Sequence, residues 1–301
     1  MMNFLARYVA LPGVLMGCMA AVSASAELAS GTPEPSVAPR YALPETEEWD
    51  LASADGSRSY RILVHRPQGA PPPAGFSVLT VLDGNALFAG LVDASRAMRF
   101  EPAGSKGLMV VAVGYPGDAA YDMQRRTFDL TPDPSAAVRG PRAAFAQGGQ
   151  REFLDFLLNR LRPELARRYP VDATRQSLYG HSFGGAFALY ALYSRPDAFQ
   201  AVVAASPSIW WNAQSVLKEE AGFMSRMSQA PDLPLQLSLR ILVGGREPGP
   251  MVGDATALAA RMQALSAKGL RSSLRVLQDE SHMSVPAAST TDVLRFVASA
   301  P

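Results

Sequence analysis

The chain has 301 residues, of which 48% are hydrophobic, and a formal net charge of +1. A chain of this size and composition can bury one large core, so we expect a single globular domain. The near-zero charge gives no support for binding to nucleic acid or another polyanion. Cys18 is the single cysteine, which excludes an internal disulfide.

The N-terminal residues have the pattern of an export signal. Arg7 precedes an apolar run over residues 8–22, and residues 24–26 (Ala-Ser-Ala) resemble a small-residue cleavage site. The sequence before Cys18 is an imperfect lipobox, so a lipid anchor on that cysteine is the alternative. The apolar run is too short and too interrupted by Pro and Gly for stable membrane insertion. We therefore predict a signal peptide over residues 1–26 and a periplasmic location.

The rest of the chain divides into a lead-in and one domain. Residues 27–45 are rich in Pro, Ser and Ala and are predicted to be flexible. Over residues 46–301 strand-like and helix-like runs alternate, which predicts a mainly parallel central sheet with helices on both faces. We expect strands at 49–53, 59–66, 76–82, 108–113, 176–179, 200–205, 237–243 and 273–277, and helices at 152–169, 186–192, 213–227, 255–268 and 290–299.

Three local features add detail to this pattern. Residues 115–148 contain many Pro, Gly and Asp and little periodicity, so we expect a long functional loop, such as a lid. Pro163 falls inside the helix predicted over 152–169, where it should cause a kink. The first two strands should form a hairpin around Asp55-Gly56.

A GxSxG pattern stands between a strand-like and a helix-like run, at Gly180-His181-Ser182-Phe183-Gly184. In that context it predicts a nucleophile elbow. The sharp turn brings backbone segments close together, so Gly180 and Gly184 are interpreted as the small residues that it needs. The helix N-terminus then points at Ser182 and favours the negative charge that develops in acyl transfer. The alternative is a Gly-rich turn with a solvated serine.

A catalytic serine needs a base, and the sequence offers three histidines. His282 follows the last predicted strand. An α/β-hydrolase places its base in a loop at this point, so His282 is the candidate. His181 is adjacent to Ser182, so their side chains diverge, and we expect it to be packed. His65 shares a strand face with Arg61, and we expect it to be solvated.

The third member of such a triad is an acid that lies between the serine and the histidine in sequence. Glu247 is the first candidate, because it follows the strand predicted over 237–243 by a few residues. Asp254 is the second, although it is also suited to cap a helix that begins near residue 255. Asp279 is close to His282 in sequence and is the third, although a turn would also explain it.

Several motifs occur in an order that resembles a known family. They are Val81-Leu82-Asp83-Gly84-Asn85, Val113-Gly114-Tyr115-Pro116, Phe128-Asp129-Leu130-Thr131-Pro132, Gly148-Gly149, the elbow, and Ser206-Pro207-Ser208-Ile209-Trp210-Trp211-Asn212. The series resembles the esterase D family, and within it the esterases of trilactone siderophores such as enterobactin, its glucosylated forms and bacillibactin. The resemblance covers residues 45–298 and implies an α/β-hydrolase fold.

The resemblance also implies where the oxyanion of the reaction is stabilised. The expected donors are the backbone N–H of Phe183, directly after the nucleophile, and the Asp83-Gly84-Asn85 loop, here assigned to Gly84 and Asn85. The alternative is that this Asp-Gly-Asn sequence is simply a favourable turn.

A ferric catecholate siderophore is an aromatic trianion, so its pocket should contain cations and rings. Arg125, Arg126, Trp210 and Trp211 are the candidates, and one tryptophan of the adjacent pair should face the cleft. However, the loop predicted over 115–148 carries equal numbers of basic and acidic residues, namely Arg125, Arg126, Arg139 and Arg142 against Asp118, Asp122, Asp129 and Asp133. A solvated loop is therefore as good an explanation as a basic pocket.

The sequence is thus interpreted as a periplasmic serine esterase of a catecholate trilactone siderophore. It should need no metal or organic cofactor, since any iron arrives with the substrate. The alternatives are a general carboxylesterase or thioesterase of small acyl groups, and a siderophore-binding protein without turnover.

Overall fold

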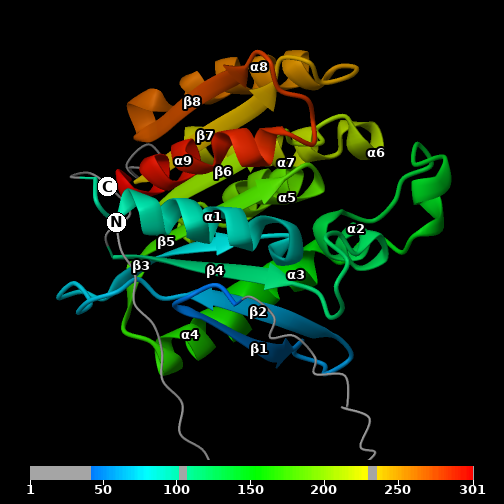
Figure 1. The fold of residues 1–301 in the computed structure, drawn as a ribbon. Helices are drawn as coiled ribbons and strands as arrows, with labels where there is room; N and C mark the ends of the chain where they lie inside the picture. Colours follow the sequence, from blue (N-terminus) through cyan, green and yellow to red (C-terminus); the bar gives the residue numbers. More distant parts are fainter. Residues whose placement is uncertain (1–41, 102–106, 230–235, 301) are drawn as a thin grey trace, which may run out of the picture. The chain divides into compact units, whose positions relative to one another are not determined.

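In the described part of the chain, eight strands form one sheet in the order β1-β2-β4-β3-β5-β6-β7-β8 (Figure 1). The computed structural model describes residues 42–101, 107–229 and 236–300. β1 and β2 form an antiparallel hairpin, and β2 is antiparallel to β4. From β4 to β8, all neighbouring strands are parallel. The predicted α/β-hydrolase architecture is confirmed.

The expected strands are all present, with ends that differ by a few residues. Their bounds are β1 Thr46–Ala52, β2 Ser59–His65, β3 Phe76–Val81, β4 Leu108–Gly114, β5 Val171–His181, β6 Ala201–Ala205, β7 Leu237–Gly244 and β8 Leu270–Leu277. The α-helices are α1 Gly84–Met98, α2 Met123–Leu130, α3 Gln150–Phe156, α4 Arg162–Arg168, α5 Phe183–Ser194, α6 Trp211–Gln214, α7 Val216–Gln229, α8 Met251–Gln263 and α9 Val285–Ala298.

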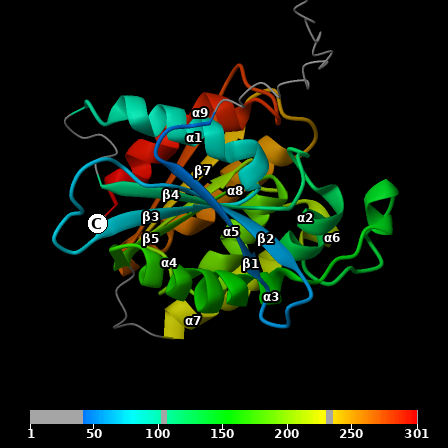
Figure 2. The ribbon, with the colours of Figure 1, turned by 60° about the horizontal axis from the view of Figure 1, so that its bottom comes forward.

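Helices cover both faces of the sheet. α1 and α9 pack on one face, and α3, α4, α5, α7 and α8 pack on the other (Figure 2). Every residue of β3, β4 and β6 is buried, as expected for parallel strands that are covered on both sides. This burial explains why these strands are continuous apolar runs in the sequence.

Some predictions concern residues outside the described ranges. The signal peptide over 1–26, the lipid-anchor alternative at Cys18 and most of the lead-in over 27–45 belong to this group, and they stay predictions. In the ranges that the structure describes, no helix has the length and apolar character needed to cross a membrane.

Three segments differ from the sequence prediction. Helix α1, Gly84–Met98, has no counterpart among the expected helices. The loop predicted over 115–148 contains helix α2, which begins after Asp122, whose carboxylate accepts a hydrogen bond from the Arg125 backbone N–H. The helix expected over 152–169 is divided into α3 and α4 by a π-helical turn, Leu157–Leu161, just before Pro163. Proline has no N–H to donate and clashes with the carbonyl four residues earlier, so the wider turn takes the place of a simple kink.

The prediction for His65 is wrong, because this side chain is only 2% exposed. The residues that lead into β1 lie beside it: Glu45 accepts a backbone hydrogen bond from Arg66, and its carboxylate lies 3.5 Å from His65 Nε2. Strand alternation alone could not show that a preceding segment covers this position.

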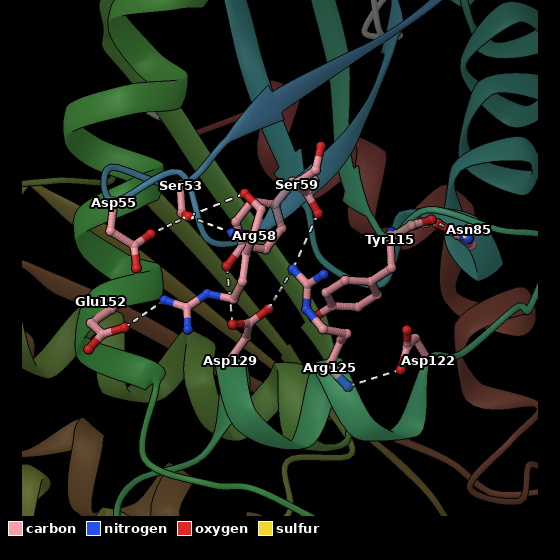
Figure 3. Close-up of polar contacts among 11 residues, drawn as sticks. Ser53, Asp55, Arg58, Ser59, Asn85, Tyr115, Asp122, Arg125, Asp129 and Glu152 are labelled. Atoms are coloured by element: carbon pink, nitrogen blue, oxygen red, sulfur yellow. Dashed lines mark hydrogen bonds and ion pairs between the residues drawn. The ribbon is translucent and has the colours of Figure 1, made fainter.

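A cluster of charged and aromatic side chains joins the β1–β2 hairpin to α2 and α3 (Figure 3). The Tyr60 hydroxyl donates to Asp129 Oδ1 at 3.1 Å, and Arg125 donates to the Ser59 carbonyl at 3.2 Å. Arg58 pairs with Glu152 at 2.6 Å. Asp129 is 1% exposed, and burial raises its pKa to about 6, although Arg125 and the Tyr60 hydroxyl act against that shift.

The raised pKa of Asp129 predicts a pH-dependent effect of Asp129→Asn on stability. Between the ordinary value of 3.8 and about 6, the folded state holds a proton that the unfolded state has released. Stability from this group is therefore lost as pH rises through that range. Relative to wild type, the variant's free energy of unfolding should increase by about 1–3 kcal/mol between pH 4.5 and 7.5. Urea unfolding at both pH values measures it.

Asp118→Asn, at an exposed position of the same segment, is the control and should show no such trend. A difference between Asp129→Asn and wild type that stays constant with pH would contradict the assignment.

Candidate active site

The chain turns sharply from β5 into α5 at Ser182. β5 ends at His181 and α5 begins at Phe183, so Ser182 stands between them with φ 62° and ψ −117°. Few residues other than glycine adopt a positive φ, and such conformations concentrate at functional sites. The turn places the serine at the N-terminus of α5, as the sequence predicts for a nucleophile elbow.

The glycines of the elbow have unequal roles. A Cβ on Gly180 would lie 2.1 Å from the Gly184 carbonyl oxygen, so position 180 requires glycine. A Cβ on Gly184 would make only ordinary contacts of 3.5 Å or more. The second steric requirement falls instead on Gly185, whose Cβ would lie 2.6 Å from the Ala205 carbonyl oxygen. The assignment of this role to Gly184 was therefore wrong by one residue.

Ser182, His282 and Glu247 form one continuous line of hydrogen-bonding contacts. Ser182 Oγ lies 3.0 Å from His282 Nε2, and His282 Nδ1 lies 2.8 Å from Glu247 Oε2. The three residues come from the elbow, the loop after β8 and the loop after β7. With Nδ1 protonated, the imidazole accepts the serine proton at Nε2, which is the arrangement needed for general-base activation of the hydroxyl.

The Glu247 carboxylate is held from several sides. Besides His282, it accepts hydrogen bonds from the Ser206 hydroxyl and, at 2.8 Å, from the Gly244 backbone N–H. Burial alone would raise the pKa of Glu247, but these hydrogen bonds outweigh it and keep the pKa below its usual value. The group is thus ionised at neutral pH and suited to stabilise an imidazolium.

The other two acids do not reach His282. Asp279 is exposed and pairs with Arg246 at 2.8 Å. Asp254 lies within the first turn of α8, which begins at Met251 and not near residue 255, so Asp254 is not the helix cap either. The structure brings only Glu247 to the imidazole among these three candidates.

His181 contacts the loop that carries His282. Its Nε2 lies 2.8 Å from the His282 carbonyl oxygen, and the two imidazole rings are 4.7 Å apart. Burial, and then the proximity of His282, lowers the pKa of His181 to about 4, so the ring is neutral and donates its Nε2 proton. The predicted packed position of His181 agrees with this arrangement.

The residues expected to stabilise an oxyanion stand at two neighbouring helix N-termini. α1 begins at Gly84 and α5 begins at Phe183, and their strands β3 and β5 are adjacent and parallel. The Asn85 side chain is already engaged with Tyr115 (Figure 3), and its amide nitrogen lies within hydrogen-bonding distance of the carbonyls of Tyr115, Gly117 and Ala119. Asn85 can therefore contribute its backbone N–H but not its amide.

Ser182 and His282 open into a cleft of about 340 Å³. Arg126, Phe183, Ser208, Trp210 and residues 248–251 also line it. Trp210, 37% exposed, is the tryptophan of the pair that faces the cleft.

Trp211 and Arg125 lie elsewhere. Trp211 is buried and packs edge-on against the Phe183 ring, at 4.8 Å between centroids. Arg125 stacks on Tyr60 and Tyr115 in the hairpin cluster, and the structure does not bring it to the cleft.

The Ser-Pro-Ser-Ile-Trp-Trp-Asn motif contains site residues that sequence reasoning did not assign. Ser206 donates to Glu247, and Ser208 Oγ lies 3.4 Å from Ser182 Oγ. Asn212 donates to the Asp133 carbonyl at 2.9 Å and accepts from the Ser135 backbone N–H at 2.8 Å. The motif was visible as a unit, but the separate partners of its polar residues required coordinates.

The geometry predicts that Glu247→Gln will lower kcat for ester hydrolysis by about 10²- to 10⁴-fold, because an amide cannot stabilise the imidazolium. Asp254→Asn and Asp279→Asn should leave kcat nearly unchanged. Steady-state kinetics on one ester substrate compares the three. A normal Glu247→Gln beside a disabled Asp254→Asn or Asp279→Asn would reassign the acid.

Comparison with known proteins gives consistent matches. A family model described as Esterase matches residues 53–280. Ferri-bacillibactin esterase BesA of Bacillus subtilis is 32% identical over 265 residues, or 85% of this chain and 90% of BesA. The siderophore triacetylfusarinine C esterase of Aspergillus fumigatus is 39% identical over 201 residues, or 63% of this chain and 65% of that protein.

A solved structure, that of the BES protein from Bacillus cereus, matches with a TM-score of 0.78 at 31% identity, covering 86% of this chain and 97% of that chain. In the described part of the chain, no cluster of three or more His, Cys, Asp or Glu side chains is placed to hold a metal ion. The chain belongs to the Esterase family, and it is a hydrolase of ester bonds whose sequence and fold resemble those of siderophore esterases.

Proposed function

We propose that this protein is a serine esterase that hydrolyses the ester bonds of a catecholate trilactone siderophore through an acyl-enzyme. The observation that carries the proposal is the hydrogen-bonded line from Ser182 through His282 to Glu247, of which Ser182 and His282 line a cleft. The names of the relatives support siderophore esters as the substrate class, since one is a ferri-bacillibactin esterase and another is a triacetylfusarinine C esterase.

In the first step Ser182 Oγ attacks the ester carbonyl carbon, and its proton moves to His282 Nε2. The carbonyl π electrons become the oxyanion of a tetrahedral intermediate, facing the N-termini of α1 and α5. When the intermediate collapses, the bond to the leaving alkoxide breaks and His282 returns the proton to that oxygen. An alcohol leaves and an ester of Ser182 remains.

In the second step, water attacks the Ser182 ester while His282 takes one of its protons. Collapse of this intermediate releases the carboxylic acid and restores the Ser182 hydroxyl. Through both steps the ionised Glu247 holds the imidazole by Nδ1 and balances its charge. The first such cycle opens the trilactone ring, and further cycles on the remaining ester bonds divide the hexadentate ligand into weaker fragments, which favours the release of iron.

One observation favours the second candidate, a carboxylesterase or thioesterase of small, uncharged acyl groups. Of the described residues that line the cleft, Arg126 is the one arginine or lysine, and its guanidinium is paired with Asp83. The cleft around Ser182 thus offers a trianion less positive charge than the sequence alone suggests. Kinetics on ferric enterobactin and on an uncharged aryl ester separate the two candidates.

The nucleophile is tested by Ser182→Ala. Because only oxyanion stabilisation and positioning remain, kcat should fall by several orders of magnitude while substrate binding stays nearly intact. Retention of more than about a tenth of the activity would remove Ser182 from this role. A fluorophosphonate should label wild type and not the variant. Failure to label wild type would favour a siderophore-binding protein without turnover.

The substrate class is tested by comparing Trp210→Ala with Trp211→Ala. Trp210 faces the cleft, so its loss should raise KM for ferric enterobactin and change the kinetics of p-nitrophenyl butyrate little. Trp211 packs on Phe183, so its loss should lower the melting temperature and affect both substrates. Equal losses on both substrates for Trp210→Ala would instead mark that ring as structural.

A further inference from the structure

A buried ion pair joins α2 to the turn before α1. Arg126 Nε and Nη2 each donate to one carboxylate oxygen of Asp83, both at 2.9 Å. The side chains are 5% and 1% exposed. A two-point contact of this kind fixes the orientation of both groups and not only their separation.

Asp83 has an unusual backbone conformation. Its φ of 53° and ψ of 48° place it in the left-handed region, and its side chain makes no capping hydrogen bond to α1. The next residue, Gly84, is confined on one side, because a Cβ there would lie 3.0 Å from the backbone of Val113 and Gly114. The direction of the Gly84 and Asn85 N–H groups thus depends on how Asp83 is held.

Arg126 also contacts the second segment that should stabilise the oxyanion. Its guanidinium lies over the Phe183 ring, 5.4 Å from the centroid. On the side of the elbow, a Cβ on Gly184 would lie 3.5 Å from Asp83 Oδ2. One ion pair therefore touches both helix N-termini, and α2 brings the arginine to this position.

We infer that Arg126 and Asp83 are positioning residues that hold the oxyanion donors of α1 and α5 in register with Ser182. This inference rests on the proposed serine mechanism and deepens it. It also gives Arg126 a role other than substrate binding, because the Asp83 carboxylate occupies the Nε–Nη2 edge of its guanidinium and neutralises its charge.

The neighbouring Arg125 provides a matched control. It stands on the same helix, donates to the Ser59 carbonyl and stacks on Tyr60 and Tyr115, away from the cleft. Replacing either arginine removes the same charge from α2. A difference between the two variants therefore reports the place of the side chain and not the net charge.

The first experiment uses p-nitrophenyl butyrate, an uncharged ester that needs no cation for binding. Arg126→Gln should lower kcat about 10²-fold with KM nearly unchanged, which is the effect of disturbing an oxyanion donor. Arg125→Gln should leave both constants nearly unchanged. An aryl trifluoromethyl ketone, which forms a tetrahedral oxyanion on the serine, should lose affinity for Arg126→Gln by the factor lost in kcat/KM.

The second experiment changes Asp83. Asn accepts a hydrogen bond from the guanidinium and tolerates left-handed backbone better than Ala. Asp83→Asn should therefore keep more of the kcat on p-nitrophenyl butyrate than Asp83→Ala does. If Arg126 instead bound substrate, Asp83→Ala would free its charge, lower KM for ferric enterobactin and leave the aryl ester unaffected.

Unchanged kcat on p-nitrophenyl butyrate for Arg126→Gln, with only a higher KM for ferric enterobactin, would overturn the inference. If Arg126→Gln does not fold, the two Asp83 variants decide the question. Equal kcat values of Asp83→Asn and Asp83→Ala on p-nitrophenyl butyrate would then overturn the inference. Failure of the serine mechanism is a separate result, because it requires an active Ser182→Ala.

Discussion

Parallel hydrogen bonding between neighbouring strands from β4 to β8 places their carboxyl ends at one edge of the sheet, and the candidate site depends on that alignment. Ser182, Glu247 and His282 follow β5, β7 and β8, while Gly84 follows β3. The loops after β7 and β8 are joined by backbone hydrogen bonds, from Gly245 N–H to Leu277 and from Arg246 N–H to Glu280. Backbone hydrogen bonds thus hold the loops of Glu247 and His282 together, independently of the contact between the two side chains.

Burial of charge in defined pairs is the second constraint at this edge. Asp83 meets Arg126 from α2, and Glu247 meets His282 and Ser206. Since a buried charge without its partner is strongly destabilising, each pair couples the position of one loop to that of another. Neutral His181 donates a hydrogen bond to the His282 carbonyl oxygen and adds no second positive charge beside the His282 imidazole.

The strands of the sheet and the three central residues were predictable, because each depends on local pattern or on scarcity, whereas helices α1 and α2 were not predicted. Buried parallel strands are apolar runs, and three histidines left one candidate at a strand end. The same reasoning could not show that Arg126 lines the cleft and Arg125 does not, because adjacent residues of a helix point in different directions and helix α2 was not predicted. It also missed the burial of His65 and the steric role of Gly185, which arise from contacts with distant segments. The partners of Ser206 and Asn212 are distant in sequence for the same reason.

The backbone of Ser182 has a consequence for the relation between stability and reactivity. With φ 62° and ψ −117°, the residue occupies a region in which a side chain costs about 1–3 kcal/mol relative to relaxed conformations. Glycine would relieve that strain and leave the surrounding packing in place, so the most stable residue at this position is one that cannot react. The elbow therefore holds Ser182 in a high-energy backbone conformation. The favourable packing of the sheet and helices on either side offsets the free-energy cost of that conformation.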